Sequence, residues 1–550
     1  MKKQTLLLAF CLMLSTAHAQ HVTDGQLFQH FDQMLSEQFK PDEPGAAVLV
    51  ARQGKVIYSK AFGMANMELN VPMENDHVFW IASLGKQFTA IAILQLMEQG
   101  KLGLQDDITR YIPDYPTRGN TITIEHLLTH SSGIHNFSGM EDPEKKLALD
   151  CTPREVIDFF KNLPMRFTPG TQWEYSNSGY FLLGYIIEVI TGQPYSAYIE
   201  DHILRPAGMT HSLYASDTRI IPNRVGAYSY GDMGYENAQA RNITHVYSAG
   251  AIQSTVADFF KWHLAVHQHQ LVKKETLERA LTRVTLTNGK EADYGYGWRL
   301  GYMYDSPSIW HGGLISGFGT TALYLPVEDV FVVVFTNCDC QYPKDIASRL
   351  AALAAGKPYT YEPISIDSSH LYAYTGVYEN EKGQQQIISV SGNTLLSQSG
   401  RGPSFILIAY QPDQFFFKDD PMQTFSFSLN GQGEVDRLTT RKLTGNEIWK
   451  KTTKPIPDPN GIHVDEKILA SYIGEYEIPS QMKFTITLEK DSLFVQAPGQ
   501  DKIEIFGDTE TKFFAKVNDA QFEFIRDDTG QITKVILNQS GRTIEAMKVK

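Results

Sequence analysis

Ser83-Leu84-Gly85-Lys86 opens the stretch of sequence that decides the fold. Apolar residues follow at helical spacing until Gly100, which predicts a helix whose first turn carries a Ser-x-x-Lys motif. Residues at positions i and i+3 share one helix face, so the Lys86 amine can reach the Ser83 hydroxyl. The positive end of the helix also favours a developing anion there. A solvated serine and lysine in a first helical turn would give the same pattern, so the motif indicates a nucleophile only together with other elements.

A second element is the Tyr-x-Asn sequence Tyr175-Ser176-Asn177, on a turn rich in Gly and Ser before an apolar helix expected over residues 181–190. Tyr175 and Asn177 can face one cleft. A tyrosine has an ordinary pKa near ~10, so it serves as a general base only where positive charge lowers that pKa. We expect Lys86 to supply this charge. Taken singly, Tyr175 is equally explained as a packed aromatic residue.

A third element, His311-Gly312-Gly313-Leu314, precedes strands expected around residues 321–325 and 331–335. Its small residues allow a substrate to lie against the backbone. The three elements, in this order and spacing, resemble the β-lactamase-related serine hydrolases: class C β-lactamases, D,D-peptidases, certain esterases and D-aminopeptidases. The likeness extends over about residues 40–340, with further matches at residues 127–134, 248–255 and 294–298.

The resemblance implies an acyl-enzyme mechanism that needs no metal and no cofactor. Ser83 is then the nucleophile, and Lys86 and Tyr175 are its proton-transfer partners. Asn177, His311 and Gly313 are implied to bind substrate, with Asn177 donating to its acyl-side amide. The backbone N–H groups of Ser83 and Leu314 are implied to form the oxyanion hole, where a lost donor commonly costs ~2.7–4 kcal/mol.

The third element departs from class C β-lactamases, which have Lys-Thr-Gly where this chain has His311-Gly312-Gly313. We therefore do not expect efficient β-lactamase activity. The His-x-Gly sequence is similar to D-aminopeptidases. A histidine with an ordinary pKa near ~6.5 is mostly uncharged at neutral pH and holds carboxylates weakly. We accordingly predict a preference for substrates without a nearby carboxylate, and a benefit of lower pH for carboxylate-bearing ones.

The chain divides into a mixed helix and strand region and a tail that is almost wholly strand-like. The resemblance implies an α+β fold for residues 20–362, with an antiparallel sheet flanked by helices and a helical subdomain. In the tail, the segment at residues 374–378 recurs 98 positions later at 472–476, and Phe415 recurs as Phe513. We predict two duplicated, lipocalin-like antiparallel β-barrels over residues 363–454 and 460–550, since closure removes exposed edges. Coincidence between two β-rich tails is the alternative.

The N-terminus has the three parts of a secretory signal peptide. Residues 1–3 give a positive start, residues 6–14 an apolar stretch, and Ala17-His18-Ala19 a cleavage site. We predict removal of residues 1–19 and a periplasmic or secreted bacterial protein without a membrane span. A buried N-terminal helix is the alternative.

Charge and cysteine content limit the partners. The formal charge of −13 leaves no basic footprint for nucleic acid. Beyond the signal peptide Cys151, Cys338 and Cys340 remain, an odd number whose pairing stays open. The sequence does not indicate an oligomeric state.

The histidines at 263, 267 and 269 could form a metal site, but no carboxylate follows at a recognisable spacing, so we expect the end of a surface helix instead.

The combined interpretation is an exported serine hydrolase that acts on amide or ester bonds of a small-molecule or peptide substrate. D-aminopeptidase or D,D-peptidase action on D-residue peptides leads. A short-chain esterase or a β-lactamase is the alternative enzyme. A catalytically silent penicillin- or ligand-binding protein is the alternative of another class.

Overall fold

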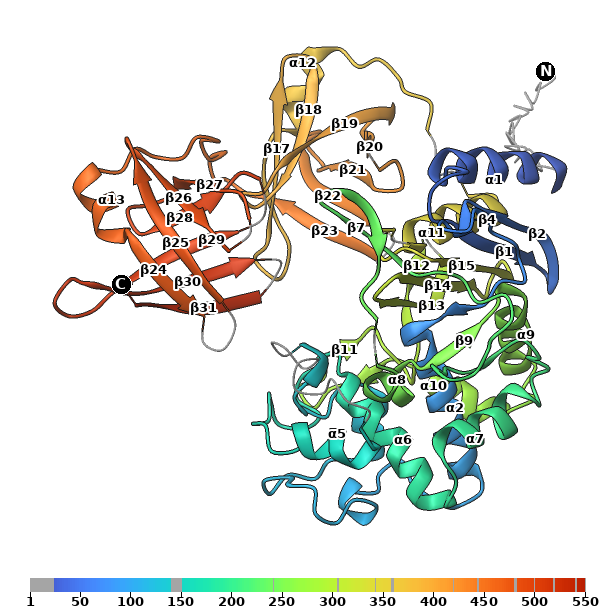
Figure 1. Ribbon diagram of the computed structural model, residues 1–550. Coiled ribbons are helices and arrows are strands. Elements are labelled where there is room, and N and C mark those ends of the chain that lie inside the picture. Colours follow the sequence, from blue (N-terminus) through green and yellow to red (C-terminus); the bar gives the residue numbers. More distant parts are fainter. Residues whose placement is uncertain are drawn as a thin grey trace, which may run out of the picture.

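The computed structural model describes residues 24–139, 151–240, 242–303, 306–341, 343–357, 361–418, 420–442, 445–478, 482–498, 500–517, 520–539 and 542–549. The predicted signal peptide, residues 1–19, lies outside this part of the chain. Figure 1 shows an N-terminal domain followed by two β-barrels.

A six-stranded antiparallel sheet forms the centre of the N-terminal domain. Its strands, in spatial order, are β12 (Arg299–Met303), β13 (Ser306–Ile315), β14 (Phe318–Leu325), β15 (Val330–Thr336), β1 (Ala46–Arg52) and β2 (Lys55–Phe62). Successive side chains of β15 alternate between two hydrophobic cores, because neighbours in a strand point to opposite faces. Both faces of the sheet are therefore covered, which explains the uninterrupted apolar run of β15.

Helices cover both faces of the sheet. Helices α1 (Asp24–Gln38) and α11 (Pro343–Ala354) pack on one face, and α2 (Gly85–Glu98) and α9 (Val256–His267) lie on the other. The rings of Phe88 and Trp262 stack with centroids 4.0 Å apart and join α2 to α9. The remaining helices are α3 (Ile124–Leu128), α5 (Pro153–Phe160), α6 (Asn177–Thr191), α7 (Tyr195–Ile199), α8 (Ile243–Val246) and α10 (Lys274–Ala280).

Short strands and tight turns complete this domain. The strands form four small sheets: β3 (Met64–Asn66) with β4 (Val71–Pro72); β5 (Phe79–Trp80) and β6 (Leu213–Tyr214) on either side of β9 (Ile252–Ser254); β7 (Tyr228–Gly231) with β8 (Gly234–Asn237); and β10 (Val284–Thr285) with β11 (Glu291–Ala292). The turns are η1 (Ala82–Leu84), η2 (Ile108–Arg110), η3 (Phe137–Gly139), the π-helical η4 (Glu200–Leu204) and η5 (Tyr247–Ala249).

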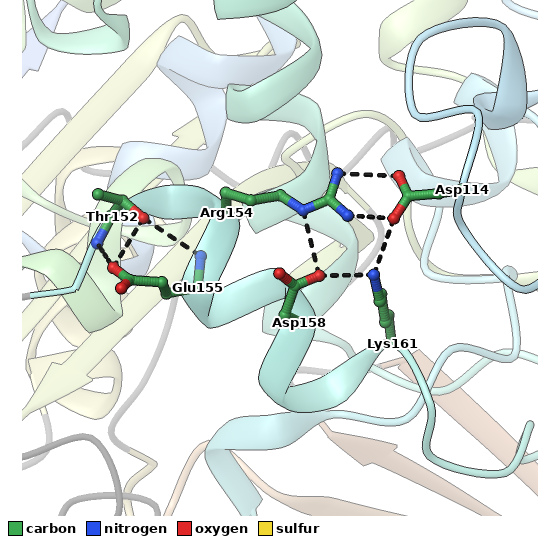
Figure 2. A network of polar contacts seen from close by, with 6 residues as sticks. All are labelled: Asp114, Thr152, Arg154, Glu155, Asp158 and Lys161. Carbon is green, nitrogen blue, oxygen red and sulfur yellow. Dashed lines mark hydrogen bonds and ion pairs between the residues drawn. The ribbon is translucent and has the colours of Figure 1, made fainter.

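Helix α5 is fixed to the loop before α3 by a network of charges (Figure 2). Asp114 accepts from Arg154 and from Lys161, whose Nζ lies 2.8 Å from its Oδ2. Lys161 also pairs with Asp158 within α5 at 2.6 Å. These side chains are exposed or partly exposed, so each pair contributes little to stability by itself. The network nevertheless fixes the orientation of α5, whose Phe160 stacks on Phe137 beside the cleft described below.

The tail forms two closed eight-stranded barrels, which confirms the predicted architecture. The first has strands β16 (Gly376–Glu379), β17 (Gln385–Ser391), β18 (Thr394–Ser399), β19 (Ser404–Gln411), β20 (Gln414–Phe417), β21 (Thr424–Leu429), β22 (Val435–Lys442) and β23 (Gly445–Lys451), after α12 (Ser368–Leu371) and η6 (Tyr372–Tyr374). The second has β24 (Gly474–Ile478), β25 (Met482–Glu489), β26 (Ser492–Gln496), β27 (Ile503–Gly507), β28 (Lys512–Ala515), β29 (Gln521–Arg526), β30 (Ile532–Gln539) and β31 (Arg542–Lys548), after α13 (Glu466–Tyr472).

The barrels share internal contacts at equivalent positions. The Tyr378 hydroxyl donates to the Tyr374 carbonyl at 2.7 Å, and 98 positions later the Tyr476 hydroxyl donates to the Tyr472 carbonyl at 2.8 Å. Both donors are fully buried. The sequence repeat therefore corresponds to a repeated structural unit.

The first barrel is docked on the N-terminal domain. Met422, in the turn between β20 and β21, is 3% exposed and packs in the core between the sheet and helices α1 and α11. Strand β23 lies beside β12, the edge strand of the sheet. The two barrels are in turn joined by Arg401, which donates to the Asp508 carboxylate and to the Asp458 carbonyl.

Cys338 and Cys340 form a disulfide, which answers the open question of their pairing and leaves Cys151 outside it. The intervening Asp339 accepts hydrogen bonds from the Gly317 N–H at 2.8 Å and from the Ser229 hydroxyl at 2.9 Å. The disulfide segment thus anchors the turn between β13 and β14.

Candidate active site

The predicted nucleophile Ser83 lies in η1, directly before α2. The preceding residue, Ala82, has a φ of 48°, in the left-handed region that a residue with a Cβ rarely adopts. Such strain persists only where the surroundings hold it, and it is frequent at functional sites. The turn leaves Ser83 partly accessible while its neighbours Ala82 and Leu84 are buried.

Lys86 lies one turn into the same segment and is fully buried. Its Nζ atom is 3.0 Å from Ser83 Oγ and donates to the Asn177 Oδ1 and the Ala249 carbonyl, each at 2.7 Å. Burial, reinforced by the positive charge of Arg299, holds the pKa of Lys86 well below its ordinary value. A neutral amine has two N–H donors and one lone pair. With both donors engaged, the lone pair is left for the Ser83 hydroxyl, so the arrangement can accept the serine proton.

The side chain of Tyr175 is hydrogen-bonded to Ser83. The Lys86 Nζ lies 4.9 Å from the centre of its ring. Burial raises the pKa of Tyr175 to about 12, while a hydrogen bond with Ser83 and the Arg299 guanidinium act in the opposite direction. We expected Lys86 to be the charge that lowers this pKa. That expectation is wrong, because the low pKa of Lys86 favours its neutral form and the nearby positive charge belongs to Arg299.

Asn177 is the first residue of α6, and the Ser176 hydroxyl caps the helix by accepting from the Gly179 N–H. The Asn177 Oδ1 accepts from Lys86, and its Nδ2 donates to the Ser138 hydroxyl at 2.7 Å. In this arrangement Asn177 orients the amine of Lys86. The Nδ2 atom carries two N–H groups, so it can keep Ser138 and still donate to a substrate, which is the role implied by the resemblance.

His311 lies on β13 and is 1% exposed. Its Nε2 is 3.0 Å from the Tyr294 hydroxyl and its Nδ1 is 2.7 Å from the Gly312 carbonyl, so Nδ1–H donates and Nε2 accepts. Burial, with Arg299 and Lys86 nearby, holds the pKa of His311 well below its ordinary value. Burial of His311 therefore argues against its protonation in mild acid, on which the predicted benefit of lower pH for carboxylate-bearing substrates depends.

Gly313 and Leu314 bring β13 against the serine turn. A Cβ on Gly313 would lie 2.6 Å from the Ile81 carbonyl oxygen and 2.5 Å from the Thr320 hydroxyl, so only glycine allows this approach. Leu314 follows directly, with its side chain 58% exposed. Strand β13 thus packs against η1, the turn that carries Ser83.

Arg299, on the edge strand β12, is the residue that sequence reasoning missed. Its guanidinium carbon lies between 5.4 and 5.9 Å from four ring centres, those of Trp173, Tyr175, Tyr294 and Trp310. Within the ranges that the structure describes, no carboxylate pairs with it. The guanidinium of Arg299 therefore lies beside Tyr175, the predicted proton-transfer partner of Ser83. The signal was present in the sequence, since Arg299 directly follows the motif at residues 294–298.

Helix α9 ends at His267 and His269 beyond it is exposed, as expected for the end of a surface helix, but His263 is not a surface residue. His263 is buried and stacks on Phe331 with ring centroids 4.2 Å apart, and His267 lies 4.5 Å from it. Burial lowers the pKa of His267 to about 4. Among the described residues, no three His, Cys, Asp or Glu side chains gather as metal ligands. In the same part of the chain, every helix is too short or too polar to cross a membrane.

Comparison with known families supports this description. Residues 26–356 match the family described as Beta-lactamase. Residues 361–452 and 458–548 each match a family described as Domain of unknown function (DUF3471), which corresponds to the two barrels.

Individual relatives extend the likeness over the whole chain. The chain is similar to Penicillin-binding protein 4* of Bacillus subtilis (strain 168), at 26% identity over 92% of this chain and 94% of that protein. It is similar to D-aminopeptidase of Gluconobacter oxydans (strain 621H), at 27% identity over 61% of this chain and 64% of that protein.

Two solved structures share the fold. The crystal structure of SurE has a TM-score of 0.56 at 17% identity over 96% of this chain and 99% of that chain. D-amino acid amidase from Ochrobactrum anthropi SV3 has a TM-score of 0.52 at 24% identity over 60% of this chain and 98% of that chain. With the family match covering more than half of the sequence, the chain belongs to the Beta-lactamase family, whose members are typically serine hydrolases.

Proposed function

We propose that the protein is a serine hydrolase that works through an acyl-enzyme. Ser83 attacks the carbonyl carbon of an amide or ester while neutral Lys86 takes its proton. The backbone N–H groups of Ser83 and Leu314 stabilise the oxyanion of the tetrahedral intermediate. Tyr175, bonded to Ser83, gives its phenolic proton to the leaving amine or alcohol, and the ammonium of Lys86 then returns a proton to the tyrosine, so that both groups are neutral again. Water then attacks the Ser83 ester with the same groups acting in reverse, which restores the free serine.

One observation carries this proposal: the hydrogen-bond geometry of Lys86. The two N–H groups of the neutral amine donate to Asn177 and Ala249. Its lone pair is left for the Ser83 hydroxyl, whose Oγ lies 3.0 Å from Nζ. Full burial favours the uncharged amine, which is the form that can act as a base. A purely structural lysine would not need this neutral, serine-facing state.

For the substrate we propose small peptides that contain a D-residue, cleaved in a D-aminopeptidase or D,D-peptidase manner. Similarity to a D-aminopeptidase and to penicillin-binding proteins supports the class. Arg299 supports the D,D-peptidase alternative, because its guanidinium can bind the free carboxylate at the end of such a peptide. The preference for substrates without a carboxylate, predicted from His311, is therefore replaced by the opposite preference.

A substrate panel tests this proposal. Purified protein is assayed with a D-alanyl-D-alanine peptide, D-alanine amide, a short-chain ester and a chromogenic cephalosporin, with Ser83→Ala as the control. We expect turnover of the D-peptide above the others and none by Ser83→Ala. Faster hydrolysis of the ester or of the cephalosporin would favour an esterase or a β-lactamase. A folded wild type inactive on every substrate and unlabelled at Ser83 would favour a binding protein.

Export remains part of the proposal and rests on residues 1–19. Mass spectrometry of the N-terminus after expression with a bacterial export system should find the chain beginning at Gln20. An uncleaved Met1 would contradict it.

A further inference from the structure

His130 follows Thr129, the residue that caps the C-terminal end of α3. It has a φ of 59°, which is unusual for a residue with a side chain. It is 1% exposed. Its ring lies among four aromatic rings, with centroid distances from 4.3 to 6.1 Å to those of Trp173, Tyr175, Tyr180 and Tyr294. The ring closest to it is that of Tyr175.

His130 holds the chain on both sides of Tyr175. Its carbonyl accepts from the Glu174 N–H at 3.0 Å, and its Nδ1 accepts from the Ser176 N–H at 3.1 Å. Glu174 and Ser176 are the two neighbours of Tyr175 in the sequence. The position of the tyrosine ring is therefore fixed from the backbone on either side and by a ring contact at 4.3 Å.

The contact with Ser176 requires neutral His130. Nδ1 can accept only when the ring proton is on Nε2, and protonation of the ring would turn Nδ1 into a second donor. Burial, with Lys86, His311 and Arg299 nearby, holds the pKa of His130 well below its ordinary value. Nε2 is buried and has no hydrogen-bond partner among the described residues. A buried donor without an acceptor is rare and calls for a functional explanation.

We propose that His130 is a positioning residue that keeps the Tyr175 hydroxyl directed at Ser83, through its hydrogen bond to Ser176 and its contact with the tyrosine ring. This inference rests on the proposed function, because Tyr175 matters to rate only if Ser83 is the nucleophile. It assigns a role to a histidine that touches neither the substrate nor the reacting atoms.

Two variants of equal size separate the hydrogen bond from the packing. His130→Asn places an amide oxygen near the position of Nδ1, whereas His130→Leu has the same shape without an acceptor. We expect His130→Leu to lower kcat about 100-fold with KM changed less than about threefold, and His130→Asn to recover most of that loss. His135→Leu, in the same loop, is the control and should match the wild type.

A second background tests whether His130 acts through Tyr175. In Tyr175→Phe, which has no hydroxyl to position, His130→Leu should cost less than about threefold further, because residues that act as one unit are not additive. An equal loss in both backgrounds, or a His130→Leu variant as active as the wild type, would overturn the inference. If His130→Leu does not fold, His130→Gln takes its place. The longer glutamine side chain carries its amide past the Ser176 N–H, so this variant should also lack the hydrogen bond. Labelling of Ser83 in the wild type is checked first, so failure of the proposed function is recognised separately.

Discussion

The Nζ atom of Lys86 lies 3.0 Å from the Oγ atom of Ser83, and the same Nζ atom donates to Asn177. No part of the Lys86 side chain reaches solvent. An ammonium group in this position would lose its hydration without gaining a carboxylate, which is costly. Burial therefore favours the neutral amine of Lys86 in the folded protein, and several measurable properties should depend on it.

The stability of the folded protein should depend on pH through Lys86. The unfolded chain holds a lysine proton up to a pKa of about 10.4, whereas the folded state releases it at lower pH. Between the two pKa values the unfolded state binds one more proton, so the free energy of unfolding rises by about 1.4 kcal/mol per pH unit. Lys86→Met removes this contribution. Denaturant unfolding at about pH 8 and about pH 10 should give a wild-type-minus-variant difference that increases with pH. If the wild-type-minus-variant difference in the free energy of unfolding does not change between the two pH values, Lys86 is charged in the folded protein.

Lys86 and Tyr175 should behave as one catalytic unit. Lys86→Ala and Tyr175→Phe should each lower kcat by about 10²- to 10⁴-fold, because each removes a proton-transfer partner of Ser83. The double variant should be little worse than the poorer single variant. Tyr230→Phe, at an exposed tyrosine in β7, is the control and should leave kcat unchanged. Two losses that multiply in the double variant would indicate independent roles.

Arg299 should determine the selectivity for a substrate carboxylate. Arg299→Gln should lower kcat/KM for a D-alanyl-D-alanine peptide relative to D-alanine amide by about tenfold to a hundredfold, while Arg299→Lys keeps the charge and loses less. The wild-type ratio should be the same at about pH 6 and about pH 8. His311, whose pKa is held well below its ordinary value, should not gain a proton in this pH range. A ratio that rises at the lower pH would restore His311 as the carboxylate-binding group.

The first barrel should contribute to the stability of the N-terminal domain through Met422. Met422→Ala should lower the free energy of unfolding by about 2–5 kcal/mol if the site behaves as a core position. Met233→Ala, at a fully exposed methionine between β7 and β8, is the matched control. Cutting the chain after residue 365 removes the same contact, so the shortened protein should unfold at a lower temperature. A truncated protein as stable as the full chain would show that barrel and domain are energetically independent.

Local patterns in the sequence predicted the parts of the fold that depend on neighbouring residues. The i, i+3 spacing of Ser83 and Lys86 is of this kind, since helix geometry acts over a few residues. The two barrels were predicted from a different signal, the repeat of residues 374–378 at 472–476. The charge state of His311 could not be predicted, because its burial results from packing between β13 and residues such as Tyr294. Arg299 was missed for a related reason: its four aromatic neighbours come from separate segments that meet only in the folded chain.

Covalent labelling of Ser83 tests the central claim most directly. The protein is incubated with a fluorophosphonate, which reacts with an activated serine hydroxyl, and the adduct is located by tandem mass spectrometry of the peptides. We predict a single adduct on Ser83 in the wild type, formed much more slowly in Lys86→Ala and absent in Ser83→Ala, with all three proteins folded. A folded wild type that stays unmodified at Ser83, or that labels equally fast with Lys86 removed, would contradict the account.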